Sequence, residues 1–253
     1  QGDRARRADW TRVTPKLALQ YAFAPRQQVY ASVADGFRAG GYNVFSPASD
    51  YAAYQPETLR AYEIGAKGWL PGNRLRYAAA FYVMTVDNMQ VQQMPLEGLV
   101  YVTNAASARS IGAEFELEYL LGQGWSLQAG LGLNRTRFSH FRDGANDYSG
   151  NQNPFAPRLN GHLTARYDAP AGWYAQASLS GTGPVYLDAA NRYRRNGYAL
   201  VNLAAGVTVR QVEIAAYVNN LANRRYDAVG YQNGIVTVYS PPREVGLRLT
   251  WRL

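Results

Sequence analysis

The sequence predicts an all-β fold, an antiparallel transmembrane β-barrel built from about eleven strands. Apolar and polar residues alternate with a period of two along most of the chain, so each set occupies one face of a strand. Short and long connections follow one another in turn, which places every short turn at one end of the sheet. Aromatic residues of the apolar face gather beside the short turns, as amphipathic rings do at a membrane boundary. These residues are Phe23, Tyr119, Trp125, Tyr167, Trp173 and Trp251, and Trp69 also lies beside a short turn.

The clearest pattern is a hairpin at residues 110–134. Its first strand has one apolar and one polar side, and the turn Gly122-Gln123-Gly124 leads into a second strand of the same kind. The apolar side carries Ile111, Ala113, Phe115, Leu117 and Tyr119, followed by Trp125, Leu127, Ala129, Leu131 and Leu133. The polar side carries Ser110, Gly112, Glu114, Glu116 and Glu118, followed by Ser126, Gln128, Gly130, Gly132 and Asn134. In a membrane barrel the apolar side faces lipid and the polar side faces a wet lumen.

The same unit recurs from one end of the chain to the other. The expected strands are residues 17–23, 28–37, 58–69, 75–90, 110–119, 125–134, 158–167, 173–180, 199–207, 212–218 and 245–253. The short turns are residues 24–27, 71–73, 122–124, 170–172 and 210–211, most of which contain Gly or Pro, residues suited to tight turns. The long connections are residues 38–56, 91–106, 139–157, 187–197 and 222–242. In the fourth strand the alternation becomes indistinct after Val83.

Length and composition are compatible with this fold. The 253 residues suit one large all-β domain. An odd strand number is unusual for a closed single-chain bacterial barrel, so residues 1–253 are expected to form one portion of a barrel. The chain has no cysteine, which excludes disulfides and thiolate metal sites. A soluble barrel with the apolar face inward is the alternative, as is a small passive porin. The abundance of Gly, Ser, Asn and Tyr on the polar face argues against the soluble alternative.

Several polar residues could suggest chemistry, and each has a structural explanation. The row Glu114, Glu116 and Glu118 is expected to form a ladder that pairs with Lys or Arg across the strands. His140 and His162 lack a cluster of further ligands, so no metal site, catalytic residue or cofactor is predicted. Ser178 and Ser180 share the polar side with His162 on the neighbouring strand, but neither lies in a nucleophile motif. Asn219, Asn220 and Asn223 are expected to hydrogen-bond the backbone of the following loop.

Four segments, in the same order along the chain, resemble motifs of TonB-dependent outer-membrane receptors. The first is Tyr30-Ala31-Ser32-Val33-Ala34-Asp35-Gly36-Phe37-Arg38-Ala39-Gly40-Gly41-Tyr42-Asn43. The second joins Gln55-Pro56-Glu57-Thr58 to Tyr62-Glu63-Ile64-Gly65-Ala66-Lys67. The third is Asn104-Ala105 followed by Gly112-Ala113-Glu114-Phe115-Glu116, and the fourth is Val218-Asn219-Asn220-Leu221-Ala222-Asn223-Arg224-Arg225-Tyr226. From the first segment to the last, the four are spread over most of the chain, residues 30–226.

The resemblance implies a barrel of about 22 strands, of which this chain would form the C-terminal half. It also implies a plug domain ahead of these residues and an inner-membrane TonB complex that supplies energy through the plug. The expected location is the outer membrane of a Gram-negative bacterium. The implied function is active import of ferric siderophores or similar nutrients, and the chain is not expected to be an enzyme. Leu253 stands where the family usually has an aromatic residue.

The partners expected from the resemblance are the TonB complex, a ferric-siderophore-like nutrient, outer-membrane lipid and lipopolysaccharide, and no nucleic acid. The candidate ligand-binding residues lie in or beside the long connections, at the end that the resemblance makes extracellular. They are Arg38, Tyr42, Tyr101, Tyr186, Arg192 and Tyr193. An anionic chelate with aromatic groups would accept charge-assisted hydrogen bonds from Arg and stack on Tyr. A solvated loop, or contact with lipopolysaccharide phosphates, is the alternative for residues 192–195. The alternative functions are an outer-membrane barrel enzyme of lipase or protease type and a passive structural barrel.

Overall fold

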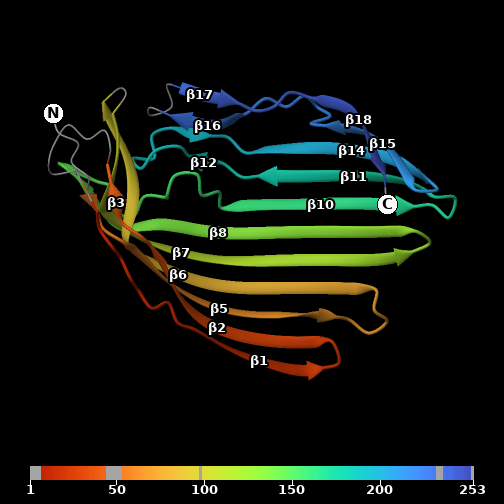
Figure 1. Ribbon diagram of the computed structural model, residues 1–253, viewed down its shortest axis with the longest axis horizontal. Helices are drawn as coiled ribbons and strands as arrows, with labels where there is room; N and C mark the ends of the chain where they lie inside the picture. Colours follow the sequence, from red (N-terminus) through yellow and green to blue (C-terminus); the bar gives the residue numbers. More distant parts are fainter. Residues whose placement is uncertain (1–6, 44–52, 97–98, 232–235, 252–253) are drawn as a thin grey trace.

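In a computed structural model, the chain folds into one long antiparallel sheet (Figure 1). The structure describes residues 7–43, 53–96, 99–231 and 236–251. Within these residues, eleven long strands pair in sequence order, which confirms the predicted fold class and strand number. They are β1 (Lys16–Ala24), β2 (Gln27–Arg38), β5 (Glu57–Trp69), β6 (Leu75–Leu96), β7 (Leu99–Gly122), β8 (Trp125–Asp143), β10 (Leu159–Asp168), β11 (Trp173–Thr182), β14 (Tyr198–Val209), β15 (Val212–Asn219) and β18 (Glu244–Trp251). The described residues contain no helix long and apolar enough to cross a membrane.

Short paired strands lie within the long connections. They form three ribbons, and one further short strand pairs with the end of β8. The short strands are β3 (Gly41–Tyr42) with β4 (Ala53–Tyr54), β12 (Val185–Tyr186) with β13 (Arg194–Arg195), β16 (Asp227–Tyr231) with β17 (Val236–Tyr239), and β9 (Asn146–Asp147). Figure 1 shows the ribbons at one end of the sheet and the tight hairpin turns at the other. The predicted sorting of short and long connections is therefore confirmed, except between β6 and β7.

The alternate residues that make up the apolar side of each strand together form a broad exposed face of the sheet. Leu131, Phe115 and Leu163 are among the large apolar residues exposed on this face. The aromatic rings beside the short turns contact one another across strands: ring centroids are 5.0 Å apart for Trp125 and Tyr167, and 5.3 Å apart for Tyr167 and Trp173. This arrangement matches a lipid-facing surface with an aromatic belt at one boundary.

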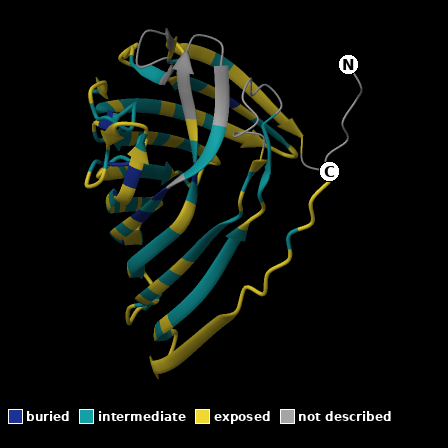
Figure 2. Ribbon diagram, turned by 90° about the vertical axis from the view of Figure 1, so that its left-hand side faces the viewer, coloured by how far each residue is buried: buried dark blue, intermediate teal, exposed yellow. Residues whose placement is uncertain are grey.

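The described sheet is curved but does not close. Figure 2 shows its curvature from the side. In the part of the chain that the structure describes, β1 pairs with β2 and β18 pairs with β15, and neither has a second neighbour. Each edge therefore presents free backbone donors and acceptors, which a complete barrel satisfies by pairing with further strands.

Residues 91–106 were expected to form a long connection, and that expectation is wrong. β6 runs to Leu96 and β7 begins at Leu99, so the two strands form a hairpin that extends beyond their neighbours. The β6–β7 register shifts between Val86 and Met89 and again between Met89 and Val91, where Asn88 adopts a φ of 53°. These bulges exchange the two faces of the strand and break the alternation from which strands are predicted.

A small apolar core lies on the lumen side of β7 and β8, at the end of the sheet that carries the long connections. Ala106, Ala108, Phe138 and Phe141 are buried there, and Tyr148 from the following loop packs against them. Ring centroids are 4.8 Å apart for Phe138 and Phe141, and 5.2 Å apart for Phe141 and Tyr148. Ala108 and Phe138 are register partners and share the parity of the polar face. The loop after β8 therefore folds inward, over the mouth of the barrel.

Candidate functional site

The loop between β2 and β5 is fastened to the tall β6–β7 hairpin by two asparagines. The side chain of Asn43 donates to the carbonyl of Val102 and accepts from its N–H, both at 2.8 Å. The side-chain amide of Asn104 donates to the carbonyl of Gln55 at 2.7 Å, and its oxygen accepts the N–H of Gln55. The same amide donates to the carbonyl of Asn88 at 2.9 Å. Each end of the described loop is thus bound to β7.

Gln90 of β6 also binds the loop between β2 and β5. Its side chain is buried, and its amide donates to the carbonyls of Ala39 at 2.8 Å and Gln55 at 3.2 Å. Its backbone N–H donates to the carboxylate of Glu57 at 2.7 Å. Sequence reasoning gave Gln90 no role, although Gln55, Glu57 and Asn104 all belong to the motifs quoted above. Their common task in this structure is to fix the loop at the mouth.

A second loop group joins residues 144–157 to residues 187–193. The N–H of Gln152 donates to the side chain of Asn191 at 2.8 Å, and the Asn191 amide donates to the carbonyl of Gln152 at 2.9 Å. The carboxylate of Asp188 accepts the backbone N–H groups of Arg192 at 3.2 Å and Tyr193 at 2.8 Å. These bonds hold the segment that contains two candidate ligand-binding residues against the inward-folded loop.

The asparagine motif after β15 organises the third loop group. Asn220 is buried, and its side chain donates to the carbonyls of Arg224 at 2.9 Å and Pro241 at 3.2 Å and accepts the N–H of Arg224. Asn223 accepts the N–H of Arg243 at 2.9 Å. The predicted backbone bonding is confirmed for these two residues. Asn219 differs, because its amide donates to the carboxylate of Glu244 at 3.2 Å.

Two tyrosines stack at the base of this third loop. The rings of Tyr198 and Tyr226 are 3.7 Å apart and nearly parallel, with an interplanar angle of 9°. Burial of Tyr226, together with its neighbour Tyr198, raises the pKa of the Tyr226 phenol above its usual value. Arg195 lies over the Tyr198 ring at 5.3 Å and donates to the carbonyls of Asp227 and Ala228. Sequence reasoning did not single out this cluster.

Arg38 is the last residue of β2, and Tyr42 follows it in β3. Arg38 is exposed, has the parity of the polar face and is the register partner of Glu57. Tyr42 is half-buried in the β3–β4 ribbon, with its ring centroid 6.4 Å from that of Trp10. The sequence analysis did not identify Trp10, which precedes the first strand and has no periodic pattern around it. Tyr42 therefore belongs to the loop that Asn104 and Gln90 fasten, and Arg38 lies directly before that loop.

The other candidates lie on the second loop group. Tyr186 is the register partner of Arg194 in the β12–β13 ribbon, and Arg192 and Tyr193 are exposed. The strand order places β6, β7, β8 and β10 between the two groups of candidates. Tyr101 lies on β7, but its side chain falls outside the described part of the structure. Five of the six candidates thus form two groups at the same end of the sheet, and Tyr101 lies on a strand between them.

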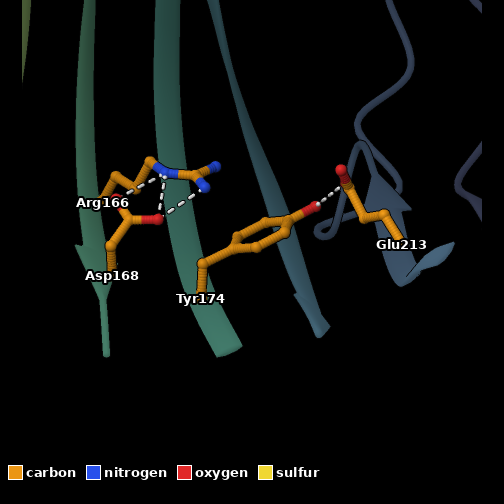
Figure 3. Close-up of polar contacts among 4 residues, drawn as sticks. All are labelled: Arg166, Asp168, Tyr174 and Glu213. Atoms are coloured by element: carbon orange, nitrogen blue, oxygen red, sulfur yellow. Dashed lines mark hydrogen bonds and ion pairs between the residues drawn. The ribbon is translucent and has the colours of Figure 1, made fainter. Parts of the chain in front are cut away.

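The polar face forms a wall of side chains that cross from strand to strand. Tyrosine rings lie over glycines on the next strand, where a Cβ would overlap the ring. These pairs are Tyr30 with Gly65, Tyr82 with Gly112, Tyr174 with Gly206 and Tyr217 with Gly246. Figure 3 shows one region of this wall, where Arg166 binds Asp168 at 2.7 Å and Tyr174 donates to Glu213 at 3.2 Å. Arg166 also lies over the Tyr174 ring at 3.9 Å.

Glu118, His162 and Ser178 have structural partners. Glu118 pairs with Arg76 at 3.6 Å, which confirms the expected cross-strand pairing for this one member of the glutamate row. The His162 ring lies over Gly130, and the Ser178 hydroxyl shares a hydrogen bond of 3.0 Å with Thr164. Within the described residues, no group of three or more histidines and carboxylates could hold a metal ion.

Residues 1–221 match a family model described as TonB dependent receptor-like, beta-barrel. The chain belongs to the TonB-dependent receptor family. Members of this family are outer-membrane proteins of Gram-negative bacteria, so the predicted family and location are confirmed.

The relatives of this receptor chain include two with named ligands. It is 31% identical over 241 residues to a pesticin receptor of Yersinia enterocolitica, covering 92% of this chain and 34% of the relative. It is 26% identical over 223 residues to a ferrioxamine receptor of the same species, covering 85% of this chain and 30% of the relative. The chain therefore spans about a third of the length of these receptors. Both relatives are receptors rather than enzymes, in agreement with the prediction that the chain is not an enzyme.

Solved receptor structures share the architecture. The ferric yersiniabactin uptake receptor of Yersinia pestis superposes with a TM-score of 0.78 at 27% identity, covering 92% of this chain and 36% of that one. A siderophore receptor of Acinetobacter baumannii gives a TM-score of 0.77 at 21% identity, covering 93% and 35%. At that identity the second likeness concerns the fold alone.

Proposed function

We propose that the chain forms the C-terminal half of the barrel of an outer-membrane receptor that imports ferric siderophores with energy from the TonB complex. The observation that carries this proposal is the construction of the mouth. Asn104, Gln90 and Asn191 bind the long loops to strands and to one another, so the loops form a supported rim. Cations and tyrosines on such a rim suit an anionic, partly aromatic chelate.

The relatives support the ligand class. One is named for ferrioxamine, and a solved relative is the uptake receptor for ferric yersiniabactin. Energy transfer from TonB would require a plug domain, and the wall of Tyr, Arg and Glu side chains is the face such a plug would meet. The exposed apolar face would contact outer-membrane lipid. Lipopolysaccharide would adjoin it at the long-loop end.

The test uses the full-length receptor. Ferric yersiniabactin and ferrioxamine serve as probes, and their binding is followed by quenching of tryptophan fluorescence. Arg38→Ala and Tyr42→Ala should each weaken binding of the recognised chelate by roughly 1–2 kcal/mol, about one charged hydrogen bond or one aromatic contact. Arg74→Ala, at the short-turn end, is the matched control and should bind normally.

Two results would contradict the proposal. Unchanged affinity in both variants would reject this binding site. If iron uptake by iron-starved cells does not depend on the receptor, siderophore import is rejected as its function.

A further inference from the structure

The outward face of the sheet changes character near the long-loop end of β7 and β8. Along β8 the outward positions Leu131 and Leu133 are followed by Arg135 and Arg137. Along β7, which runs the other way, Ile111 is preceded by Arg109. The register is regular from Ala108 to Leu120, so these arginines keep the parity of the apolar residues. Three cations therefore share the parity of the lipid-facing side; Arg109 and Arg135 are exposed, and Arg137 is half-buried.

The register brings two of these cations face to face. Arg109 is the direct partner of Arg137, and Arg135 is the partner of Ile111. Directly opposed like charges on one face of a sheet are destabilising unless an anion lies between them. In the described part of the chain, none of the three arginines forms an ion pair with a carboxylate.

Among the described residues, Arg60 lies in the same cross-strand row and, unlike Arg109 and Arg137, it is paired with a carboxylate. The row passes from Asp35 through Arg60 and Thr85 to Arg109 and Arg137. Arg60 binds Asp35 with two hydrogen bonds of 2.6 and 2.8 Å, so its charge is neutralised within the chain. Thr85, the neighbour of Arg109 on β6, offers no charge. The unneutralised part of the row is thus confined to β7 and β8.

An apolar groove lies immediately beside this cluster. It has a volume of about 560 Å³, and its apolar lining includes Leu17, Leu19, Ile64, Phe81, Val83 and Ile111. Ile111 belongs to both features, because it lines the groove and faces Arg135 across the strands. Arg137 is held in place by a hydrogen bond of 2.8 Å from its Nη1 to the carbonyl of Gly150. Anion-binding groups and a surface for hydrocarbon therefore adjoin.

We propose that Arg109, Arg135 and Arg137 bind the phosphate-bearing headgroup of an outer-leaflet lipid, whose acyl chains lie along the groove that Ile111 lines. Guanidinium groups bind phosphate oxygens with charge-assisted, often bidentate hydrogen bonds. A phosphate between Arg109 and Arg137 would also remove the repulsion between them. The proposal rests on the proposed function in one respect, since that function sets the long-loop end outside the cell.

The test compares lipids by native mass spectrometry of the full-length receptor in detergent. The probes are bis-phosphorylated lipid A, dephosphorylated lipid A and inorganic phosphate. Lipid A should bind and survive mild activation, whereas dephosphorylated lipid A should bind at least about tenfold more weakly, because it lacks the charged hydrogen bonds. Equal binding of the two lipids would mean that the apolar face alone holds them and would overturn the proposal. Full competition by inorganic phosphate would identify a free-anion site instead, which also overturns it.

Matched variants locate the site. Arg109→Gln/Arg135→Gln should weaken lipid A binding about tenfold or more. Arg74→Gln/Arg210→Gln removes the same charge at the short-turn end and should leave it unchanged. If the first double variant does not assemble, Arg109→Lys/Arg135→Lys keeps the charge, and its affinity should be intermediate because lysine lacks the planar fork. Equal affinity of wild type and either outer-face variant would reject the site.

Binding of ferric chelates in the same samples separates the two proposals. Arg109→Gln/Arg135→Gln should bind ferric chelate normally, because these arginines face away from the lumen. A receptor that binds lipid A through these arginines but imports no ferric chelate would reject only the proposed function.

Discussion

Asn104 holds the backbone of Gln55 through two hydrogen bonds, as donor to its carbonyl at 2.7 Å and as acceptor of its N–H. The residues are 49 positions apart, and the bonds join a strand to the far end of a loop. Asn104 acts there as a backbone segment would, completing a short stretch of pairing. The loop that contains Tyr42 is positioned by this contact.

Asn104→Ala should loosen that loop without unfolding the barrel. The variant loses bonds to Gln55 and Asn88, each worth roughly 0.5–1.5 kcal/mol. Hydrogen exchange of the backbone around residues 53–57 in the full-length receptor should become faster, while exchange in β10 and β11 stays the same. Asn196→Ala, an exposed position in another loop, is the control. Equal protection of residues 53–57 in wild type and Asn104→Ala would show that the bonds do not order the loop.

An arginine introduced on the apolar face should lower the free energy of unfolding more than an arginine introduced on the polar face. Leu131 is on the exposed apolar face, and Glu116 points to the polar face. Leu131→Arg should destabilise the receptor in lipid bilayers by roughly 2–4 kcal/mol if it lies near the midplane, whereas Glu116→Arg should cost much less. Unfolding by guanidinium in vesicles measures both. A larger cost for Glu116→Arg would mean that the faces have been assigned the wrong way round.

Glycine is required where a tyrosine ring crosses the next strand. A Cβ on Gly206 would meet the Tyr174 ring, the carbonyl of Ile214 and the Cβ of Ala215 at once. Gly206→Ala should therefore cost roughly 1–3 kcal/mol, as overpacking does elsewhere. At Gly181 a Cβ would meet a single backbone oxygen at 3.8 Å, so Gly181→Ala should be nearly neutral. The midpoint temperatures of thermal unfolding of the two variants are compared in the same detergent. Equal midpoint temperatures would contradict the prediction that only Gly206 needs to be glycine.

The stacked tyrosines should make stability sensitive to alkaline pH. Burial beside Tyr198 raises the pKa of Tyr226, so folding favours the neutral phenol. The contribution is complete below the ordinary pKa of about 10 and is lost as pH rises through the raised value. Tyr226→Phe should lose less stability than wild type between about pH 9 and 12.

Thermal melts across this pH range measure the effect, and Tyr239→Phe controls for the loss of an exposed phenol in the adjoining β16–β17 ribbon. If Tyr226→Phe and wild type lose stability in parallel, the stacked pair does not contribute in this way.

The strands and their faces could be predicted from the sequence because a period of two is a local property. From Ser110 to Asn134, each side chain is assigned to a face by its neighbours alone, and the turn at Gln123 fixes the hairpin. The same reasoning yields the order of strands, since short turns force sequence neighbours to pair. The role of Asn220 could also be anticipated, because its partners Arg224 and Pro241 lie within the loop that follows it.

Other features depended on contacts between distant residues. The tall β6–β7 hairpin escaped prediction because bulges around Asn88 exchange the two faces, and its pairing becomes evident only when both strands are aligned. The hydrogen bonds from Asn104 to Gln55 and from Gln90 to Ala39 join residues far apart in the chain. The sequence around a polar side chain does not indicate which distant residue it will bind. The opposition of Arg109 and Arg137 depends on a register that a shift of one residue would remove. The sequence by itself determined which residues face lipid and which face the lumen, because alternation is short-range. Only the tertiary structure decided which loops are tied to which strands and which charges meet, because those relations are set by pairing across the sheet.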